Sequence, residues 1–497
     1  MPVTKKAATE KIVTEKTITE WTQWPWQHWA TVCPKKQAIQ LYDEKLDWQQ
    51  LTQKINAIAA IFHQQGLSEG HGVVLRGKNS SELLLCYLAA LRCGARVLPL
   101  NPQLPEPLLA ALLPHLNLTY GVDFTDSSSS AIQVRKLNWQ QRLPDLPESQ
   151  LFEQQLSGQQ LSGQHAVSWE SQRPASMILT SGSSGLPKAA VHSVNAHLAN
   201  AQGILSCMNF QPDDSWLLSL PLFHVSGQGI LWRWLQTGAK LVLRDLRLLG
   251  QALSGCTHAS LVPTQLWRLL NQPNKHQLTL KEVLLGGAMI PTELTQRAEQ
   301  LGIRCWCGYG LTEMASTVCV KRADGLPGVG NPLPGKAIRL VDEDIQIRAD
   351  SIANGYWFDG ELKPLADKEG WFSTRDRGVF EQGELRILGR LDNQFFSGGE
   401  GIQPEDIERI INLHPQIEQS FVIPIPDIEF GHRPVAVIDT QNPVLTETLL
   451  DWLTGKLASF QRPIACYLLP HQLKNGGIKI SRQQVKQWIV ETISKNK

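Results

Sequence analysis

A hydroxyl-rich stretch at residues 180–193, TSGSSGLPKAAVHS, contains a single cation, Lys188. It directly follows the apolar run MIL at residues 177–179, which is typical of a buried strand. Glycines let backbone N–H groups approach a ligand closely, and successive amides form a nest that binds anions. Hydroxyls add donors, and the lysine adds a compact positive charge. The stretch is therefore predicted to bind phosphate. The alternative, a mobile Gly/Ser linker, explains neither the preceding strand nor the closing Pro-Lys.

The common nucleotide motifs do not account for this loop. In a Walker A loop the lysine follows glycine directly, whereas a Leu-Pro pair separates Gly185 from Lys188, and Ala189 replaces the hydroxyl residue. Neither GYG at 308–310 nor GVG at 328–330 is completed to the dinucleotide motif G-x-G-x-x-G. A serine hydrolase is not indicated either, because the sequence has no G-x-S-x-G nucleophile elbow.

Composition sets broad limits on partners and location. A chain of 497 residues is too long for one ordinary core, so we expect two or more domains. The net charge of +1 gives no electrostatic reason to expect nucleic acid or an anionic membrane as a partner. The nine cysteines are odd in number and include no C-x-x-C pair, which indicates reduced thiols in a cytoplasmic protein. No apolar run approaches the ~20 residues that cross a bilayer, so no membrane span is expected.

The elements that must position the loop follow an α/β pattern. Residues 39–122 alternate strand-like and helix-like segments (GVVLRG, SELLLCYLAALRCG, ARVLPLNP), which predicts a parallel sheet covered by helices. The same alternation returns after residue 168 on both sides of the loop. Between about 124 and 168 a serine run and a tandem QQLSG repeat predict a flexible surface insertion.

Two further units are expected after the α/β layers. Residues 326–388 have Gly/Pro turns and short strands, such as GELRILG, which favour a β-rich subdomain. A last α+β unit follows, with PEDIERIINLH as a helix and QSFVIPIPD and PVAVID as strands. The predicted organisation is a polar N-terminal tail at 1–20, a large α/β domain at 21–389 and a small, mobile α+β domain at 390–497.

Six motifs in sequence give a specific family resemblance. They are TSGSSGLPKAAVH, LPLFHVSGQG, GYGLTEMAS, STRDRG, LGRLDNQFFSGGEGIQPEDIE and GGIKISR, and the similarity runs from about Trp24 to the C-terminus. Together they resemble the adenylate-forming superfamily of acyl-CoA synthetases and luciferase-like enzymes. The resemblance implies that ATP activates a carboxylate as an acyl-adenylate, pyrophosphate leaves, and a thiol displaces AMP. Three departures, Ser184 for threonine and Ala189 and Ile478 for glycine, remove no chemical group.

The same resemblance assigns residues to ATP. Tyr309, followed by Gly310, would stack on adenine, Thr312 would contact the α-phosphate, and Glu313 would bind Mg²⁺. The departing phosphates would be held by Thr180, Ser181, Gly182, Ser183, Ser184, Gly185 and Lys188.

Asp376 would accept hydrogen bonds from the ribose hydroxyls, and Arg390 would also contact the nucleotide. Considered without the family, Asp376 fits a turn-capping aspartate, and Glu313 fits an acid at a helix N-terminus equally well.

Residues for the two chemical steps follow from the later motifs. Lys479 would bridge the attacking carboxylate and the α-phosphate, and His224 would lie beside the acyl carboxylate. Asp392 matches the hinge of the small domain, and the pantetheine arm of coenzyme A would pass over Gly398 and Gly399. The alternatives are a solvated loop lysine at 479 and an ordinary core histidine at 224.

The acid is suggested by the stretches LPLFHVSGQGILWRWLQTGA, THASLVPTQLWRLL and LLGGAMIP. They are similar to those of family members that activate o-succinylbenzoate, an aromatic keto acid with two carboxylates, in menaquinone biosynthesis. The expected ligands are therefore o-succinylbenzoate, ATP, coenzyme A and Mg²⁺, while the oligomeric state stays open, a homo-oligomer included. The pocket needs donors for the unreacted carboxylate, and the candidates are Ser226, Ser260, Thr264, Gln265, Gly286 and Gly287.

Other functions stay open from the sequence. They are an aryl- or acyl-CoA ligase for a different acid, a luciferase-type oxidase, an inactive binding homologue and a nucleotide-binding regulator. The presence of Glu313, Asp376 and Lys479 disfavours the inactive homologue.

Overall fold

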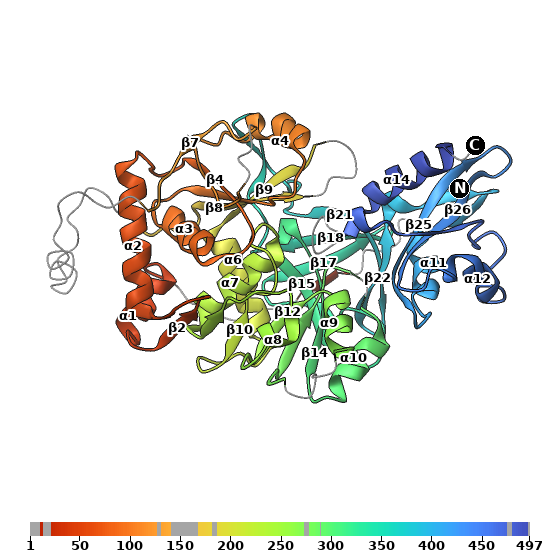
Figure 1. Ribbon diagram of the computed structural model, residues 1–497, viewed down its shortest axis with the longest axis horizontal. Helices are drawn as coiled ribbons and strands as arrows, with labels where there is room; N and C mark the ends of the chain where they lie inside the picture. Colours follow the sequence, from red (N-terminus) through yellow and green to blue (C-terminus); the bar gives the residue numbers. More distant parts are fainter. Residues whose placement is uncertain are drawn as a thin grey trace.

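The computed structural model describes residues 10–12, 21–126, 131–140, 167–180, 186–272, 278–288, 290–474 and 480–495. Figure 1 shows a large body of helices and sheets that ends in a smaller unit, drawn in blue, at the C-terminal end of the chain. The predicted α/β class, with a β-rich part and a small α+β unit, is confirmed.

The first layer of the large body is an eight-stranded sheet. Its strands are β4 (Gly72–Arg76), β5 (Arg96–Leu100), β6 (Tyr120–Asp123), β7 (Arg135–Lys136), β8 (Pro174–Thr180), β9 (Lys188–Ser193), β19 (Gly355–Phe358) and β20 (Glu361–Lys363). They lie in the order β20-β19-β9-β8-β5-β4-β6-β7. Both β4 and β5 are buried at every position, which explains why these parallel strands are apolar in sequence apart from Arg76 and Arg96 at their ends.

The second layer is a nine-stranded sheet. Its strands are β2 (Gln37–Gln40), β3 (Lys45–Asp47), β10 (Ser215–Leu217), β11 (Lys240–Val242), β12 (His258–Leu261), β13 (Glu282–Leu285), β14 (Arg304–Leu311), β15 (Ser316–Arg322) and β16 (Asn331–Pro332). The order is β16-β15-β14-β13-β12-β10-β11-β2-β3, and the strands from β13 to β11 run parallel.

Helices fill the space between and around the two sheets. They are α1 (Pro25–Val32), α2 (Trp48–Gln64), α3 (Ser81–Arg92), α4 (Glu106–Leu112), η1 (Leu113–Leu116), α6 (Val194–Leu205), α7 (Val225–Thr237), α8 (Leu249–Ala252), α9 (Pro263–Leu270) and α10 (Thr292–Glu299). Helix α3 begins where the Ser80 hydroxyl accepts the Leu83 N–H, and the chain turns at Gly94 with φ of 73°. One hydrophobic cluster contains residues of α3, α6, α7 and both sheets, so the two layers share a core.

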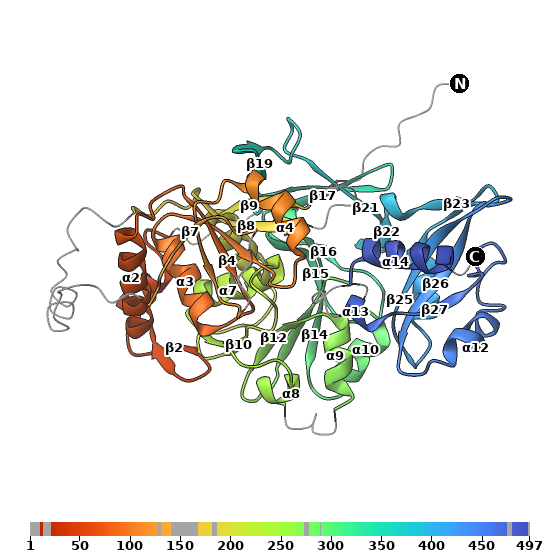
Figure 2. The ribbon, with the colours of Figure 1, turned by 45° about the horizontal axis from the view of Figure 1, so that its top comes forward.

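A third sheet joins the large body to the small unit. It has the order β1-β17-β18-β21-β22, with β1 (Glu10–Ile12), β17 (Lys336–Val341), β18 (Asp344–Ala349), β21 (Phe372–Glu381) and β22 (Glu384–Arg390). Two expectations differ from this arrangement. Residues 10–12 of the predicted tail form an edge strand paired with β17, because that strand leaves one edge open. Strands β19 and β20 leave the predicted β-rich subdomain and extend the eight-stranded sheet beside β9 (Figure 2).

The small unit follows a short 3-10 helix, η4 (Leu391–Asn393). It contains β23 (Phe395–Ser397), β24 (Glu400–Ile402), α11 (Pro404–Ile411), β25 (Ile417–Asp427), β26 (Gly431–Thr440), α12 (Leu445–Trp452), β27 (Cys466–Leu468), α13 (His471–Lys474) and α14 (Arg482–Lys495). Successive residues of β25 face opposite sides: Val422 packs with α11 and α12, while Phe421 and Ile423 pack with α14 (Figure 1). The unit therefore has its own two-sided core.

The segment predicted as an insertion is only partly outside the fold. Within it, Arg135 and Lys136 form edge strand β7 beside β6, and Leu137 is buried. The N–H groups of Arg135 and Leu137 donate to the carbonyl oxygens of Thr119 and Gly121, a pairing that the weak sequence pattern did not reveal. The QQLSG repeat lies outside the described residues. Across the part of the chain that the structure describes, no helix is both long and apolar enough to span a membrane.

Candidate active site

The candidate site lies where the parallel strands β12 and β13 end beside β14, which continues to Leu311. The register pairs Leu261 of β12 with Leu285 of β13, and Leu285 with Cys307 of β14. The loops that follow are consequently adjacent: a Cβ on Gly286 would lie 3.4 Å from the carbonyl oxygen of Gly308. Ligands of α/β proteins bind at this carboxyl edge of parallel strands. The predicted acyl loop and the GYGLTE motif therefore share one edge.

The GYGLTE motif forms a tight hairpin between β14 and β15, with η3 (Thr312–Met314) at its tip. A Cβ on Gly310 would lie 2.0 Å from the Ser316 carbonyl oxygen, so only glycine fits there. Ala315 has φ of 53°, a left-handed conformation that alanine seldom adopts. The tip must be held by its surroundings to keep this shape.

Two buried side chains hold the tip. His192 Nε2 donates to the Thr312 carbonyl oxygen at 2.7 Å, and Asn200 Nδ2 donates to the carbonyls of Met314 and Thr317 at 3.0 and 2.8 Å. Burial lowers the pKa of His192 to about 4, so the ring is neutral at physiological pH. These residues fix the backbone that carries Glu313.

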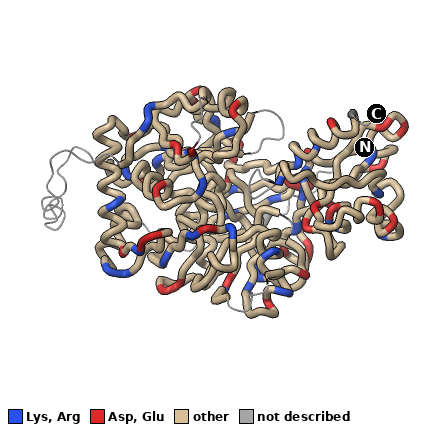
Figure 3. Tube along the Cα trace, in the orientation of Figure 1, with Lys and Arg blue, Asp and Glu red and all other residues tan. Residues whose placement is uncertain are grey.

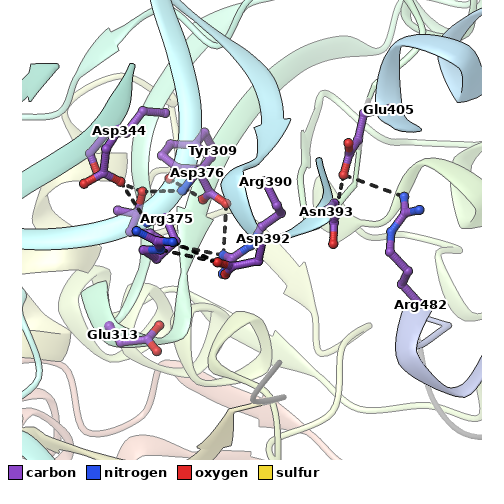
Figure 4. Close-up of polar contacts among 12 residues, drawn as sticks. Tyr309, Glu313, Asp344, Arg375, Asp376, Arg390, Asp392, Asn393, Glu405 and Arg482 are labelled. Carbon is purple, nitrogen blue, oxygen red and sulfur yellow. Dashed lines mark hydrogen bonds and ion pairs between the residues drawn. The ribbon is translucent and has the colours of Figure 1, made fainter. Parts of the chain in front are cut away.

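Three residues assigned to the nucleoside meet in one cluster (Figure 4). Tyr309 donates its hydroxyl to Asp376 Oδ2 at 2.6 Å, and Arg390 Nη1 donates to Asp376 Oδ1 at 3.0 Å. Burial and the Asp376 carboxylate raise the pKa of Tyr309, which keeps the phenol protonated. The cluster brings an aromatic ring, a carboxylate and a guanidinium together from β14, β21 and β22. The aromatic ring is suited to stacking on a nucleotide base, and the carboxylate is suited to accepting hydrogen bonds from the ribose diol.

The cluster extends to the predicted hinge residue Asp392 on η4. Its two carboxylate oxygens accept from Arg375 Nη2 at 3.1 Å and from Arg390 Nη2 at 3.3 Å. Arg375 has φ of 62°, and its strained backbone is held by an N–H bond to Asp344 Oδ1 at 3.0 Å. The sequence analysis did not identify Arg375 or Asp344.

Over the rest of the described chain, positively and negatively charged residues are interspersed (Figure 3).

The phosphate end of the site is described in part. Thr180 and Lys188 are cross-strand partners at the ends of β8 and β9, so they mark the two ends of the phosphate loop. Glu313 lies apart from the Tyr309 cluster in Figure 4. The remaining assigned residues, Ser181, Gly182, Ser183, Ser184 and Gly185, lie outside the described residues.

Glu313 is chemically suited to Mg²⁺ in the presence of phosphates. One carboxylate oxygen accepts from Tyr356, and the side chain is only partly buried. Within the described ranges, no three His, Cys, Asp or Glu side chains gather as a metal cage. Mg²⁺ is commonly held by one or two carboxylates together with substrate phosphates, so a single acid fits this chemistry.

The predicted acyl residues surround the loops after β10, β12 and β13. His224 is the N-cap of α7, and Ser226 is in the first turn of that helix. Thr264 and Gln265 are in the first turn of α9. The Gln265 side-chain oxygen accepts the Val262 N–H at 3.0 Å, so it is used in capping its own helix. Ser260 is buried at the end of β12. Gly286 and Gly287 follow β13, and Gly287 has φ of 82°.

Arg233 is a site residue that the sequence analysis did not identify. It lies in α7, is 1% exposed, and donates to Ser260 Oγ at 3.4 Å. A Cβ on Gly229 would lie 3.0 Å from its Nη2. Its Nε and Nη2 have no hydrogen-bond partner among the described residues. The sequence did contain a signal for it: an arginine within the apolar run ILWRWL indicates a functional role, because burying a cation is costly.

The small unit carries the assigned residues of the later steps. Lys479 lies outside the described residues, but α14 begins three residues later at Arg482. Arg482 Nη2 donates to the buried Glu408 Oε2 at 2.6 Å, and its Nη1 donates to the Val422 carbonyl at 2.9 Å. Gly398 and Gly399 have φ of 59° and 87° in the turn between β23 and β24.

The fold and the geometry of the site define an enzyme that binds AMP, and comparison with known families agrees. The model of the AMP-binding enzyme family matches residues 26–357, and that of the AMP-binding enzyme C-terminal domain matches residues 406–495. The chain belongs to the AMP-binding enzyme family.

Individual relatives narrow the similarity to one type of ligase. The chain is 55% identical to the 2-succinylbenzoate–CoA ligase of Salmonella typhimurium over 91% of this chain and 95% of that protein. A structure of an E. coli MenE variant with bound OSB-AMS has 51% identity and a TM-score of 0.85, covering 95% of this chain and all of that one. A Bacillus subtilis MenE structure with ATP and magnesium ion, at 21% identity, has a TM-score of 0.76 over 93% of this chain and 96% of that one, which shows the common fold.

Proposed function

We propose that this chain is an AMP-forming acid–thiol ligase that joins o-succinylbenzoate to coenzyme A. The carboxylate would attack the α-phosphorus of ATP and release pyrophosphate, and the thiol of coenzyme A would then displace AMP from the acyl-adenylate. The product, o-succinylbenzoyl-CoA, belongs to menaquinone biosynthesis. The identity with a 2-succinylbenzoate–CoA ligase supports the proposal. Nine free cysteines and the use of ATP and coenzyme A support a cytoplasmic location.

The residues of the site divide between the two ends of ATP. Asp376, Arg390 and Tyr309 would hold the nucleoside, and Lys188 with residues 180–185 would hold the departing phosphates. Mg²⁺, held by Glu313, would neutralise phosphate charge. Lys479 would stabilise the charge that develops between the attacking carboxylate and the α-phosphate.

The single observation that carries the choice of acid is Arg233. A buried guanidinium without an acidic partner is costly, because desolvation of the charge is not compensated. Among the described residues Arg233 forms no ion pair, and its one hydrogen bond is to the neutral Ser260. An anionic group bound in the pocket would compensate the charge. The unreacted ring carboxylate of o-succinylbenzoate supplies such a group.

The test compares o-succinylbenzoate with the analogue that lacks the ring carboxylate, in the wild type and in Arg233→Met. The wild type is expected to prefer the diacid by about 10³-fold in kcat/KM, because the analogue leaves buried donors unpaired. Arg233→Met should reduce this preference to about tenfold or less, and Arg233→Lys should retain part of it. The ratio of the kcat/KM values for the two acids is taken within one variant, so any general loss of folded enzyme cancels.

The alternative function is an aryl- or acyl-CoA ligase for a different acid. Near-equal kcat/KM values for the two acids in the wild type, or a preference for benzoate-like or fatty acids, would favour it. Absence of acid-dependent ATP–pyrophosphate exchange with every acid would instead favour a nucleotide-binding regulator.

A further inference from the structure

Two residues assigned to the phosphates, Lys188 and Glu313, are joined by the side chain of Tyr356. The Tyr356 hydroxyl donates to Glu313 Oε1 at 2.6 Å. The ammonium group of Lys188 lies 4.8 Å from the centroid of the Tyr356 ring, within the range of a cation–π contact. One side chain thus contacts a cation from the phosphate loop and a carboxylate from the β14–β15 hairpin.

The position of Tyr356 is fixed by strands on both sides. In β19 it pairs with Ala190 of β9 and with Lys363 of β20. The start of β19 is also tied to the hairpin tip, because the Ala353 N–H donates to the Glu313 carbonyl oxygen at 2.8 Å. A phenol hydroxyl is protonated at neutral pH and donates to the carboxylate. The ring and the hydroxyl are therefore held rigidly against both partners.

We propose that Tyr356 is the positioning residue of the phosphate end of the site, orienting the Glu313 carboxylate and the Lys188 ammonium for Mg·ATP. The inference rests on the proposed function, which assigns both partners to ATP. The hydroxyl orients the Glu313 carboxylate, because it donates a short, charge-assisted hydrogen bond to one of the two carboxylate oxygens. The ring acts on Lys188 by restricting where its flexible four-carbon chain places the charge.

Nucleotide binding to the full chain, measured by calorimetry without acid or coenzyme A, tests the two contacts separately. Tyr356→Phe keeps the ring and removes the hydroxyl, so Mg·ATP should bind about tenfold more weakly. ATP in EDTA should bind as in the wild type, because Glu313 acts only through the metal. Tyr356→Leu also removes the ring, so it should bind ATP about threefold more weakly even in EDTA.

AMP binding is the internal control, because AMP lacks the β- and γ-phosphates. All variants should bind AMP within twofold of the wild type. Phe358→Leu, a change of an aromatic residue on the same strand, should leave every affinity unchanged. Equal weakening of AMP and Mg·ATP by Tyr356→Phe would mean a general structural role and would overturn the proposal, as would unaltered Mg·ATP binding.

The design separates this inference from the choice of acid. No carboxylic acid is present in the binding measurements, so a failure of the chain to use o-succinylbenzoate leaves the result for Tyr356 interpretable. Conversely, unaltered Mg·ATP binding by Tyr356→Phe would leave the acid specificity as proposed.

Discussion

At the scale of single residues, the site combines charged groups at its surface with neutral groups beneath it. His192 illustrates the second kind: it is fully buried and supports the backbone of Thr312. His197 is buried beside it, with Nε2 2.7 Å from the Ser176 hydroxyl and its ring stacked on Trp232. Burial lowers the pKa of both histidines. The support of the hairpin therefore depends on imidazoles that stay uncharged.

A pH-dependent loss of stability follows from His192. Its pKa is about 6.5 in the unfolded chain and about 4 in the folded chain. As pH falls below 6.5, the unfolded state binds a proton that the folded state does not, so the free energy of unfolding decreases until about pH 4. Between pH 7.5 and 5.0, the wild type should lose ~2 kcal/mol more than His192→Gln, which retains a donor at the position of Nε2. Denaturant unfolding followed by tryptophan fluorescence measures the difference.

The control for this prediction is His432→Gln, which replaces a histidine on the surface of the small unit. It should show the same pH dependence as the wild type. If His192→Gln also loses stability in parallel with the wild type, the buried ring does not contribute in the way described.

At the scale of elements, the connection from β22 through η4 to β23 contains the predicted hinge residue, Asp392. Asp392 is bound by Arg375 and Arg390, and Arg390 is bound in turn to Asp376 of the nucleoside cluster. The Arg390 guanidinium therefore links the predicted hinge residue to the residues assigned to the nucleotide. Rotation of the small unit about η4 must break or rearrange these ion pairs.

Asp392→Pro should separate the two half-reactions. Proline fixes φ and restricts the preceding residue, so it opposes a rotation that only thioester formation requires. We expect adenylation, measured by pyrophosphate release, to stay within about threefold of the wild type, and thioester formation to fall at least ~10-fold. Asp392→Ala removes the same carboxylate but leaves φ free, so it should retain both steps within a few-fold. Equal effects of proline and alanine on thioester formation would contradict a hinge at this position.

At the scale of the whole molecule, the sequence predicted what is local or shared by the family. The βαβ layers, the GYGLTE motif and the C-terminal unit are each indicated by patterns within short segments of the sequence. The cluster of Tyr309, Asp376 and Arg390 followed from motifs in the correct order. Its mutual hydrogen bonds needed the structure, because Tyr309 of β14 lies 67 residues before its partner Asp376 in the β21–β22 hairpin.

Residues that depend on long-range packing were not predictable from one sequence. In the sequence, Tyr356 is an ordinary strand residue of the predicted β-rich subdomain. Only the structure shows that its strand, β19, pairs with β9 of the eight-stranded sheet. The strand at residues 10–12 depends on an open edge of β17, and the strain at Arg375 depends on Asp344. The apolar run ILWRWL marks Arg233 as unusual, but only the structure shows that its Nε and Nη2 have no hydrogen-bond partner among the described residues.

The predicted division of chemistry between the two units rests on Lys479, which lies in the sequence of the small unit, whereas the cluster of Tyr309, Asp376 and Arg390 belongs to the large one. The segment that contains Lys479 is followed at once by α14, whose first residue Arg482 is bound to Glu408 of α11. This buried ion pair anchors the start of α14 to α11 in the body of the small unit.

Lys479→Ala should abolish acyl-adenylate formation while thioester synthesis from preformed acyl-adenylate largely survives. The ammonium group is needed only while negative charge develops between the carboxylate and the α-phosphate, and losing such a group costs about 10²–10³-fold in rate. Both steps are measured on one preparation, by pyrophosphate release and by thioester formation from synthetic acyl-adenylate. Lys474→Ala is the matched control, because this lysine of α13 is bound to Asp439 within the small unit and should leave the ratio of the two rates unchanged. A folded Lys479→Ala variant that loses both steps equally would show that the lysine serves a purpose common to both, not the first step alone.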